Sequence, residues 1–221
     1  MASAKGKIKR PVKSSTVSMS RMDFEIAVLV YKRFTAIGLT DEEVSFLLGK
    51  RNKYVFDLLD PTEKDKFKTE QMDILPTILG NKIRDVVSND IKPNENVNIK
   101  ALRKVLPTKI VYEYVMVYPD NTESELVTIT KKLIKGDRKK LHEQVHDLTL
   151  KLIEEEHFLK GRNALELFLL YKGRLKVPFS PADLQKNLAV LMNKKRNEKP
   201  ILVCESEGAR YWYRQYGFLE E

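Results

Sequence analysis

The stretch Leu39–Pro61 restricts what this chain can fold into more than any other, because it carries two short helical patterns with a fixed break between them. Thr40 followed three residues later by Glu43 is a capping box, in which each side chain satisfies a free backbone N–H at the start of a helix. Gly49 is typical of a helix end, and Asn52–Asp60 resumes the apolar spacing of a helix before a proline stops it. The sequence therefore predicts two short helices joined by a tight turn.

Helical patterns also flank this stretch. Asp23–Ile37 places apolar residues at helical spacing and is followed by Gly38, a residue type common just after a helix. Met72–Val87 is amphipathic, with Pro76 expected to bend the helix or to mark its first turn. Together these segments predict a compact helical domain over residues 22–88.

The pattern of Leu39–Pro61, LTDEEVSFLLGKRNKYVFDLLDP, resembles the Cro/C1-type helix-turn-helix family of bacterial and phage regulators. The resemblance implies a sequence-specific DNA-binding protein, a transcription regulator, whose second motif helix lies in the major groove. Four apolar side chains are expected to form the small core of the motif: Val44, Leu48, Val55 and Leu58. A homodimer is expected as well, because one short helix reads few base pairs and paired half-sites multiply specificity.

By the same resemblance, the DNA-binding residues are Thr40, Lys50, Arg51, Asn52, Lys53, Tyr54 and Asp57. Arg51 is suited to guanine and Asn52 to adenine, since each can form two hydrogen bonds with the base edge. Lys53 or Tyr54 is suited to a phosphate. Asp57 departs from the family pattern, because a carboxylate near the DNA backbone lowers affinity. The expected partner is double-stranded DNA.

The charge balance favours polyanionic partners. With 40 Lys plus Arg against 31 Asp plus Glu, the formal net charge is +9. Residues 1–21 hold six basic residues and no acid, in a composition that predicts a disordered basic tail. Such a tail can neutralise phosphates and add affinity that is independent of DNA sequence, although a solvated end without function is equally compatible with this composition.

The character of the chain changes after residue 88. Residues 89–98 are expected to be a linker, and residues 99–221 a mixed α/β domain that contains a β-hairpin at residues 109–130. The predicted fold class is therefore α+β, with an N-terminal all-α helix-turn-helix domain followed by a mixed α/β domain.

The end of the chain has two interpretations. Leu165–Arg214 is patterned as helix, helix and hairpin, which is typical of a C-terminal winged-helix-like unit with its wing at Ile201–Arg214. Four basic residues would then face phosphates: Lys194, Lys195, Arg196 and Lys199. A half-buried strand with Trp212 in the core explains the alternation around that residue equally well.

A short motif offers an enzyme alternative. His142-Glu143-Gln144-Val145-His146 fits the H-E-x-x-H pattern, in which two histidines hold zinc and the glutamate activates water, so a zinc metallopeptidase fused to a helix-turn-helix is one hypothesis. Charged residues next to the motif, and the lack of a convincing third zinc ligand, favour ordinary surface histidines over a zinc site. We therefore predict neither catalysis nor a cofactor. The other alternative is a protein-interaction or structural module with non-specific nucleic-acid affinity through its basic tail.

The sequence also bears on location. The single cysteine, Cys204, cannot form an internal disulfide and is expected to be a buried structural thiol. The first residues lack the apolar core of a secretory signal. The apolar run Ile26–Tyr31 is far shorter than the roughly 20 residues that cross a bilayer. A cytoplasmic protein with no membrane partner is expected.

Overall fold

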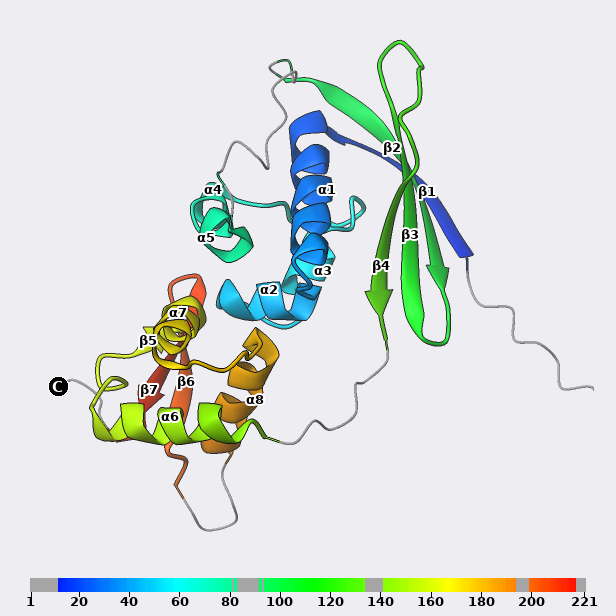
Figure 1. Ribbon diagram of the computed structural model, residues 1–221. Coiled ribbons are helices and arrows are strands. Elements are labelled where there is room, and N and C mark those ends of the chain that lie inside the picture. The colour runs from blue at the N-terminus through cyan, green and yellow to red at the C-terminus, as the bar shows by residue number, and fades with distance from the viewer. Residues whose placement is uncertain are drawn as a thin grey trace, which may run out of the picture. The chain divides into compact units, whose positions relative to one another are not determined.

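The computed structural model describes residues 12–80, 82, 92, 94–133, 141–193 and 199–217. The chain divides into two compact units (Figure 1). Unit 1 comprises Met1–Arg33, Phe56–Lys68 and Lys82–Gly136, and unit 2 comprises Phe34–Val55, Thr69–Asn81 and Asp137–Glu221. Each unit thus draws on three separate stretches of the chain, whereas the ranges expected from the sequence are contiguous.

Unit 1 is built on a four-stranded antiparallel sheet in the order β1-β2-β3-β4 (Figure 1). Its strands are β1 (Val12–Ser20), β2 (Asn96–Val105), β3 (Lys109–Val117) and β4 (Val127–Lys132). β1 pairs with β2 without interruption, from Val12 opposite Lys104 to Ser20 opposite Asn96. The hairpin expected at residues 109–130 is present as β3 and β4.

The expected N-terminal all-α domain is wrong, because the sheet begins at residue 12. Val12–Ser20, expected as part of a disordered tail, is a strand whose Ser15, Val17 and Met19 are half-buried on one face. Its partner β2 lies about 80 residues later in the chain, so the local composition, which is poor in large apolar side chains, could not reveal the pairing. Residues 1–11 of the expected tail lie outside the described residues.

One face of the sheet packs against the first helix, α1 (Arg21–Ala36), whose residues up to Arg33 belong to unit 1 (Figure 1). The Phe24 ring meets the Tyr114 ring edge to face, with 6.0 Å between centroids. The Tyr31 hydroxyl accepts a hydrogen bond of 3.0 Å from the Thr130 N–H of β4. Side chains on this face of the sheet are buried: Val97, Ile99, Ala101, Tyr112, Tyr114, Met116 and Ile129. The core of unit 1 therefore lies between α1 and the sheet.

Unit 2 combines short helices with a second, three-stranded sheet in the order β5-β7-β6. Its elements are α2 (Asp41–Leu47), α4 (Thr69–Met72), α5 (Leu75–Leu79), α6 (Glu143–Glu154), β5 (Arg162–Asn163), α7 (Ala164–Arg174), α8 (Pro181–Met192), β6 (Leu202–Glu207) and β7 (Arg210–Gln215). The helix, helix and hairpin expected for Leu165–Arg214 are present as α7, α8 and β6–β7.

The helix expected over Met72–Val87 is shorter in the structure. Met72–Val87 is replaced by α4 and α5, because Gly80 adopts a left-handed conformation with φ of 66° and ends α5. Pro76 lies in the first turn of α5, which is one of the two places expected for it. Residues 83–87 lie outside the described residues.

In the described ranges, no helix is both long enough and apolar enough to pass through a membrane.

A buried polar network joins three helices of unit 2. The Tyr171 hydroxyl donates to Thr149 Oγ1 at 2.7 Å, and the Asn187 side-chain amide donates to the same oxygen. Asn187 Oδ1 lies 2.8 Å from His146 Nδ1. Burial raises the pKa of Tyr171 to about 12. Because α6, α7 and α8 each contribute a side chain to this network, it fixes how they pack.

Candidate nucleic-acid interface

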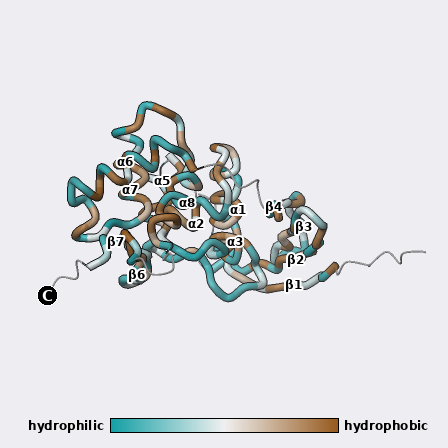
Figure 2. The backbone as a smooth tube through the Cα atoms, turned by 90° about the horizontal axis from the view of Figure 1, so that it is seen from below, coloured by the Kyte–Doolittle hydropathy of each residue, from teal (hydrophilic) through white to brown (hydrophobic). Residues whose placement is uncertain are grey.

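The first helix of the predicted motif begins where the sequence places it. Glu43 N–H donates to Thr40 Oγ1 at 3.2 Å, and Thr40 N–H donates to a Glu43 carboxylate oxygen at 2.9 Å. Both halves of the capping box are therefore formed, and α2 starts at Asp41. α2 opens with three acidic residues and ends with Phe46 and Leu47 (Figure 2), and the helix is buried from Glu43 to its end. The predicted helix start is confirmed.

The expected motif core is also confirmed as buried. Val44 and Val55 have no exposed surface, and Leu48 and Leu58 are almost fully buried. Sequence reasoning missed Ser45, whose hydroxyl donates to the Asp41 carbonyl at 2.7 Å and accepts from Val55 N–H at 3.0 Å. This hydroxyl bridges α2 to Val55, the second residue of the next helix, α3 (Tyr54–Leu58). A serine within a helical pattern gives no signal of such a role.

The four residues after Gly49, Lys50–Lys53, form what we call the basic loop. Arg51, Asn52 and Lys53 are exposed in it. The helix expected over Asn52–Asp60 is the five-residue α3 (Tyr54–Leu58), so these three side chains lie on a turn rather than on a helix. The helix tightens at its end through bonds from Leu59 N–H to Phe56 and from Asp60 N–H to Asp57, before Pro61 stops it.

Gly49 lets the start of the basic loop lie directly on the β6–β7 hairpin. Its carbonyl accepts a hydrogen bond of 2.9 Å from Tyr211 N–H, and its φ is 68°. A Cβ at this position would lie 3.1 Å from Arg210 Cβ and 3.2 Å from the Tyr211 nitrogen. The Lys50 ammonium donates to the Ala209 carbonyl in the same hairpin. Both the conformation and the close approach require glycine here.

The middle of the basic loop is held by α8. Gln185 Nε2 donates to Asn52 Oδ1 at 2.8 Å. Sequence reasoning missed Gln185, Arg210 and Tyr211 as neighbours of the loop, because all three lie more than 130 residues away in the chain. A half-buried polar residue such as Gln185 in an amphipathic helix carries no signal of its partner. The loop is thus anchored on both sides within unit 2.

Lys50 and Tyr54 are engaged inside unit 2. The Lys50 ammonium lies 5.2 Å from the centroid of the Tyr54 ring and 3.8 Å from the Glu70 carboxylate. The Tyr54 hydroxyl accepts a hydrogen bond of 2.7 Å from the Gln71 side chain. The side chains of Lys50 and Tyr54 therefore hold the loop against unit 2.

Charges around the basic loop are unevenly placed. Lys186 on α8 and Arg210 on β7 are half-exposed cations in the elements that hold the loop. A Glu43 carboxylate oxygen lies 3.4 Å from the Ala182 nitrogen in the first turn of α8. On the hairpin, Arg214 pairs with Glu205 at 3.4 Å and with Glu207 at 2.5 Å. Positive charge thus gathers on the loop, while carboxylates occupy the α8 N-terminus and the hairpin.

Two predicted site residues lie apart from the loop. Thr40 is exposed, but its side-chain oxygen serves the cap of α2. Asp57 is half-buried on α3 and belongs to unit 1, whereas residues 50–54 belong to unit 2. The structure brings together Lys50, Arg51, Asn52, Lys53 and Tyr54.

The remaining candidate sites of the sequence have ordinary structural roles. His142 is the N-cap of α6, its Nδ1 accepting from Val145 N–H at 3.4 Å, and His146 joins the buried network. The described residues contain no group of three side chains that could hold a metal. Cys204, expected as a buried thiol, is exposed on β6, so that expectation is wrong. Lys199 lies 5.7 Å from the centroid of the Tyr216 ring. Lys194–Arg196 lie outside the described residues.

Comparisons of the chain with protein-family models, with curated proteins and with solved structures found no match. Function must therefore be argued from the geometry of the basic loop and its surroundings.

Proposed function

We propose that this protein binds double-stranded DNA through the basic loop of unit 2. The observation that carries the proposal is that Arg51, Asn52 and Lys53 are exposed on a short turn anchored at both sides. The Gly49 to Tyr211 bond holds its start, and the Gln185 to Asn52 bond holds its middle. A loop fixed in this way loses little conformational entropy on binding, which favours affinity.

The side chains of the loop have distinct chemistry. Arg51 offers a fork of donors that matches the two acceptors on the major-groove edge of guanine. Lys53 is suited to a phosphate, to which it contributes charge without base preference. Asn52 Oδ1 already accepts from Gln185, so only its N–H donors are available to DNA. We therefore assign Asn52 a contact to a single acceptor rather than the two-bond pairing with adenine.

Phosphate binding in this proposal depends on side chains and not on a helix end. The first turn of α8 already lies beside the Glu43 carboxylate, which opposes an anion there. Each phosphate neutralised by Lys or Arg releases counterions, so affinity falls with rising salt. Removing one such contact lowers the slope of log affinity against log salt concentration by about 0.9.

Fluorescence anisotropy with a labelled duplex of mixed sequence tests the proposal. We expect the double variant Arg51→Ala/Lys53→Ala to bind more weakly and with a smaller salt slope than the wild type. The matched control is Lys109→Ala/Lys132→Ala, which removes the same charge from exposed lysines of β3 and β4 in unit 1. Equal weakening in both double variants would mean that the loop is not the binding element.

A role as a transcription regulator requires sequence preference in addition. Selection of bound duplexes from a randomised library is expected to enrich a guanine-containing site with the wild type. Arg51→Ala is expected to lose about 1–3 kcal/mol of discrimination at one position. A library that stays random with the wild type would restrict the proposal to non-specific binding.

The carboxylates beside the loop favour one alternative, a protein-interaction module. Glu43, Glu205 and Glu207 would repel a DNA backbone close to the α8 N-terminus and the hairpin. In that case DNA affinity would reside in the basic residues before β1. Deleting residues 1–11, which leaves β1 intact, would then abolish binding, whereas the loop variant would bind like the wild type.

A further inference from the structure

The sheet of unit 1 ends in two edge strands, and β4 is protected. Its Thr130 N–H, which faces away from β3, donates to the Tyr31 hydroxyl at 3.0 Å. The pairing also slips by one residue beside this strand. Ser124 N–H donates to the Met116 carbonyl, while Val127 lies opposite Tyr114. The chain thus advances three residues from Ser124 to Val127, against two residues of β3 from Tyr114 to Met116. This is a β-bulge, and both devices hinder the addition of another strand.

The other edge strand, β1, carries neither device. All nine of its residues pair with β2 in one unbroken register. Its sequence, VKSSTVSMS, contains no proline or glycine and a single charge, Lys13. Proteins commonly protect an edge with prolines, charges or bulges, because unpaired N–H and C=O groups attract another strand. A nine-residue edge with one charge and neither proline nor bulge is open to pairing.

The ladder shows which backbone groups of β1 face outward. Arg21 N–H donates to the Glu95 carbonyl at 2.9 Å, and this pair continues the register of β1 with β2. Since the bonding direction alternates along an antiparallel strand, odd-numbered residues face β2 and even-numbered residues face out. The outward set is Val12, Ser14, Thr16, Ser18 and Ser20, of which the first four are exposed and Ser20 is half-buried.

We propose that β1 pairs antiparallel with β1 of a second copy of this chain, around a two-fold axis at Thr16. In this register Thr16 lies opposite the partner's Thr16, and Ser14 lies opposite the partner's Ser18. Every pair that exchanges hydrogen bonds then joins two outward-facing residues. Lys13 falls opposite the partner's Met19, so like charges do not meet. Two four-stranded sheets become one continuous sheet.

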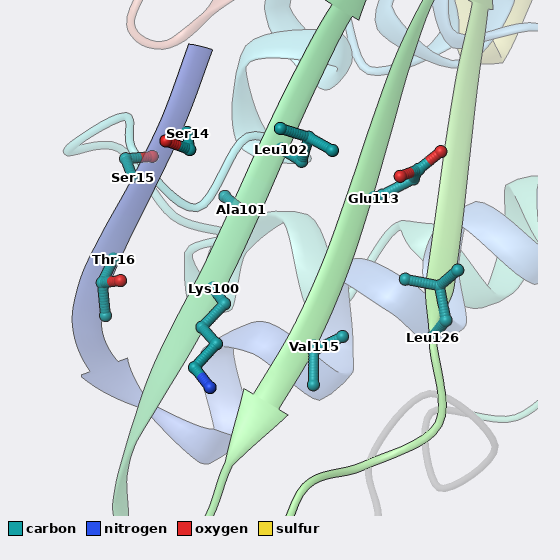
Figure 3. Close-up of a pocket in the computed structure, with 9 residues that line it drawn as sticks. All are labelled: Ser14, Ser15, Thr16, Lys100, Ala101, Leu102, Glu113, Val115 and Leu126. Carbon is teal, nitrogen blue, oxygen red and sulfur yellow. The ribbon is translucent and has the colours of Figure 1, made fainter. Parts of the chain in front are cut away.

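Side chains along β1 suit such pairing. Ser14, Ser15 and Thr16 are short and border an open hollow of about 650 Å³ on the outer face of the sheet, beside Lys100 and Leu102 of β2 (Figure 3). Short side chains leave the strand backbone accessible to a neighbour. Thr–Thr and Ser–Ser pairs across adjacent strands also form favourable cross-strand contacts.

The difference between the two edges also sets the size of the assembly. Pairing of β1 with β1 uses the same surface twice and closes after two copies. Pairing of β1 with β4 would instead repeat without end, as in a fibre. The Tyr31 contact and the bulge beside β4 oppose that second mode. A dimer is therefore expected rather than a polymer.

Light scattering coupled to size exclusion, performed on the full chain without DNA, tests this pairing. The wild type is expected to be a dimer. Thr16→Pro removes an outward N–H at the two-fold axis while sparing the bonds to β2, so the dimer dissociation constant should rise roughly tenfold or more. Thr16→Lys places two like charges opposite each other and should raise it several-fold.

The matched control is Thr128→Lys, the same change at an exposed position of β4. This variant should remain a dimer, with thermal unfolding followed by circular dichroism to show that each variant is folded. Should Thr16→Pro not fold, Thr16→Lys decides the matter. A wild type that is monomeric at every concentration, or a folded Thr16→Lys that associates as tightly as the wild type, would overturn the proposal.

Discussion

The two units expose different kinds of binding group. Unit 1 presents backbone, because β1 is an edge strand of its sheet with neither proline nor bulge. Unit 2 presents side chains, because its basic loop is anchored so that Arg51 and Lys53 are exposed. Backbone hydrogen bonding across a strand edge depends little on side-chain identity, so it suits association of identical chains. Cationic side chains held at fixed positions suit a polyanion instead. We therefore propose that unit 1 mediates self-association and that unit 2 binds DNA.

The units also differ in how their cores are assembled. Unit 1 depends on large aromatic side chains between sheet and helix, such as Tyr114, which is fully buried. Unit 2 adds to its apolar core the hydrogen-bonded network around Thr149, Tyr171 and Asn187.

The largest effect is expected in the core of unit 1. Tyr114→Ala should lower the free energy of unfolding by about 3–5 kcal/mol, since it removes a fully buried ring that packs on Phe24. Tyr114→Phe keeps the ring and removes only the hydroxyl that donates to the Leu59 carbonyl, at about 1 kcal/mol. Urea unfolding measures both variants. Equal losses would contradict a core held mainly by aromatic packing.

A smaller effect is expected where the basic loop meets the hairpin. Gly49→Ala should cost about 1–3 kcal/mol, because alanine disfavours the positive φ and its Cβ would crowd Arg210 and Tyr211. Gly80→Ala is the matched control, with a φ of 66° and nothing within 4 Å of the added Cβ. Thermal unfolding should show a larger loss for Gly49→Ala. If the two glycines respond equally, the close approach of loop and hairpin does not contribute.

The smallest effect concerns pH. The hydrogen bond from Arg174 holds the pKa of Glu155 below its ordinary value. The ion pair therefore stabilises the fold above the pKa of the unfolded chain, and that contribution disappears as pH falls through the lower folded value. Between about pH 5 and pH 3, the wild type should lose slightly more stability than Glu155→Gln. Stability curves that run parallel for the two proteins would show that this surface pair contributes nothing measurable.

Local signals predicted part of this structure. The capping box of Thr40 and Glu43, the turn at Gly49 and the stop at Pro61 act over a few residues, and the structure has α2 and α3 at those places. The order of α7, α8 and the hairpin also follows from contiguous patterns. The residues responsible for such local interactions lie within a few positions of one another, so a short stretch of sequence reveals them.

Long-range pairing could not be predicted in the same way. β1 is a strand because β2, about 80 residues later, completes its ladder, and its own Ser-rich composition resembles that of a tail. The candidate site shows the same division. Arg51 and Lys53 stand out as basic residues after a turn, but the bonds that fix their loop come from Gln185 and Tyr211.

The most direct test of the central claim is photocrosslinking from the loop to DNA. A benzophenone label on Lys53→Cys, in a Cys204→Ser background, is compared with the same label on Lys109→Cys of unit 1. If the basic loop contacts DNA, irradiation with a bound duplex gives a protein–DNA adduct from position 53 and little from position 109. An adduct from position 109 alone, or equal yields from both, would contradict DNA binding by the loop.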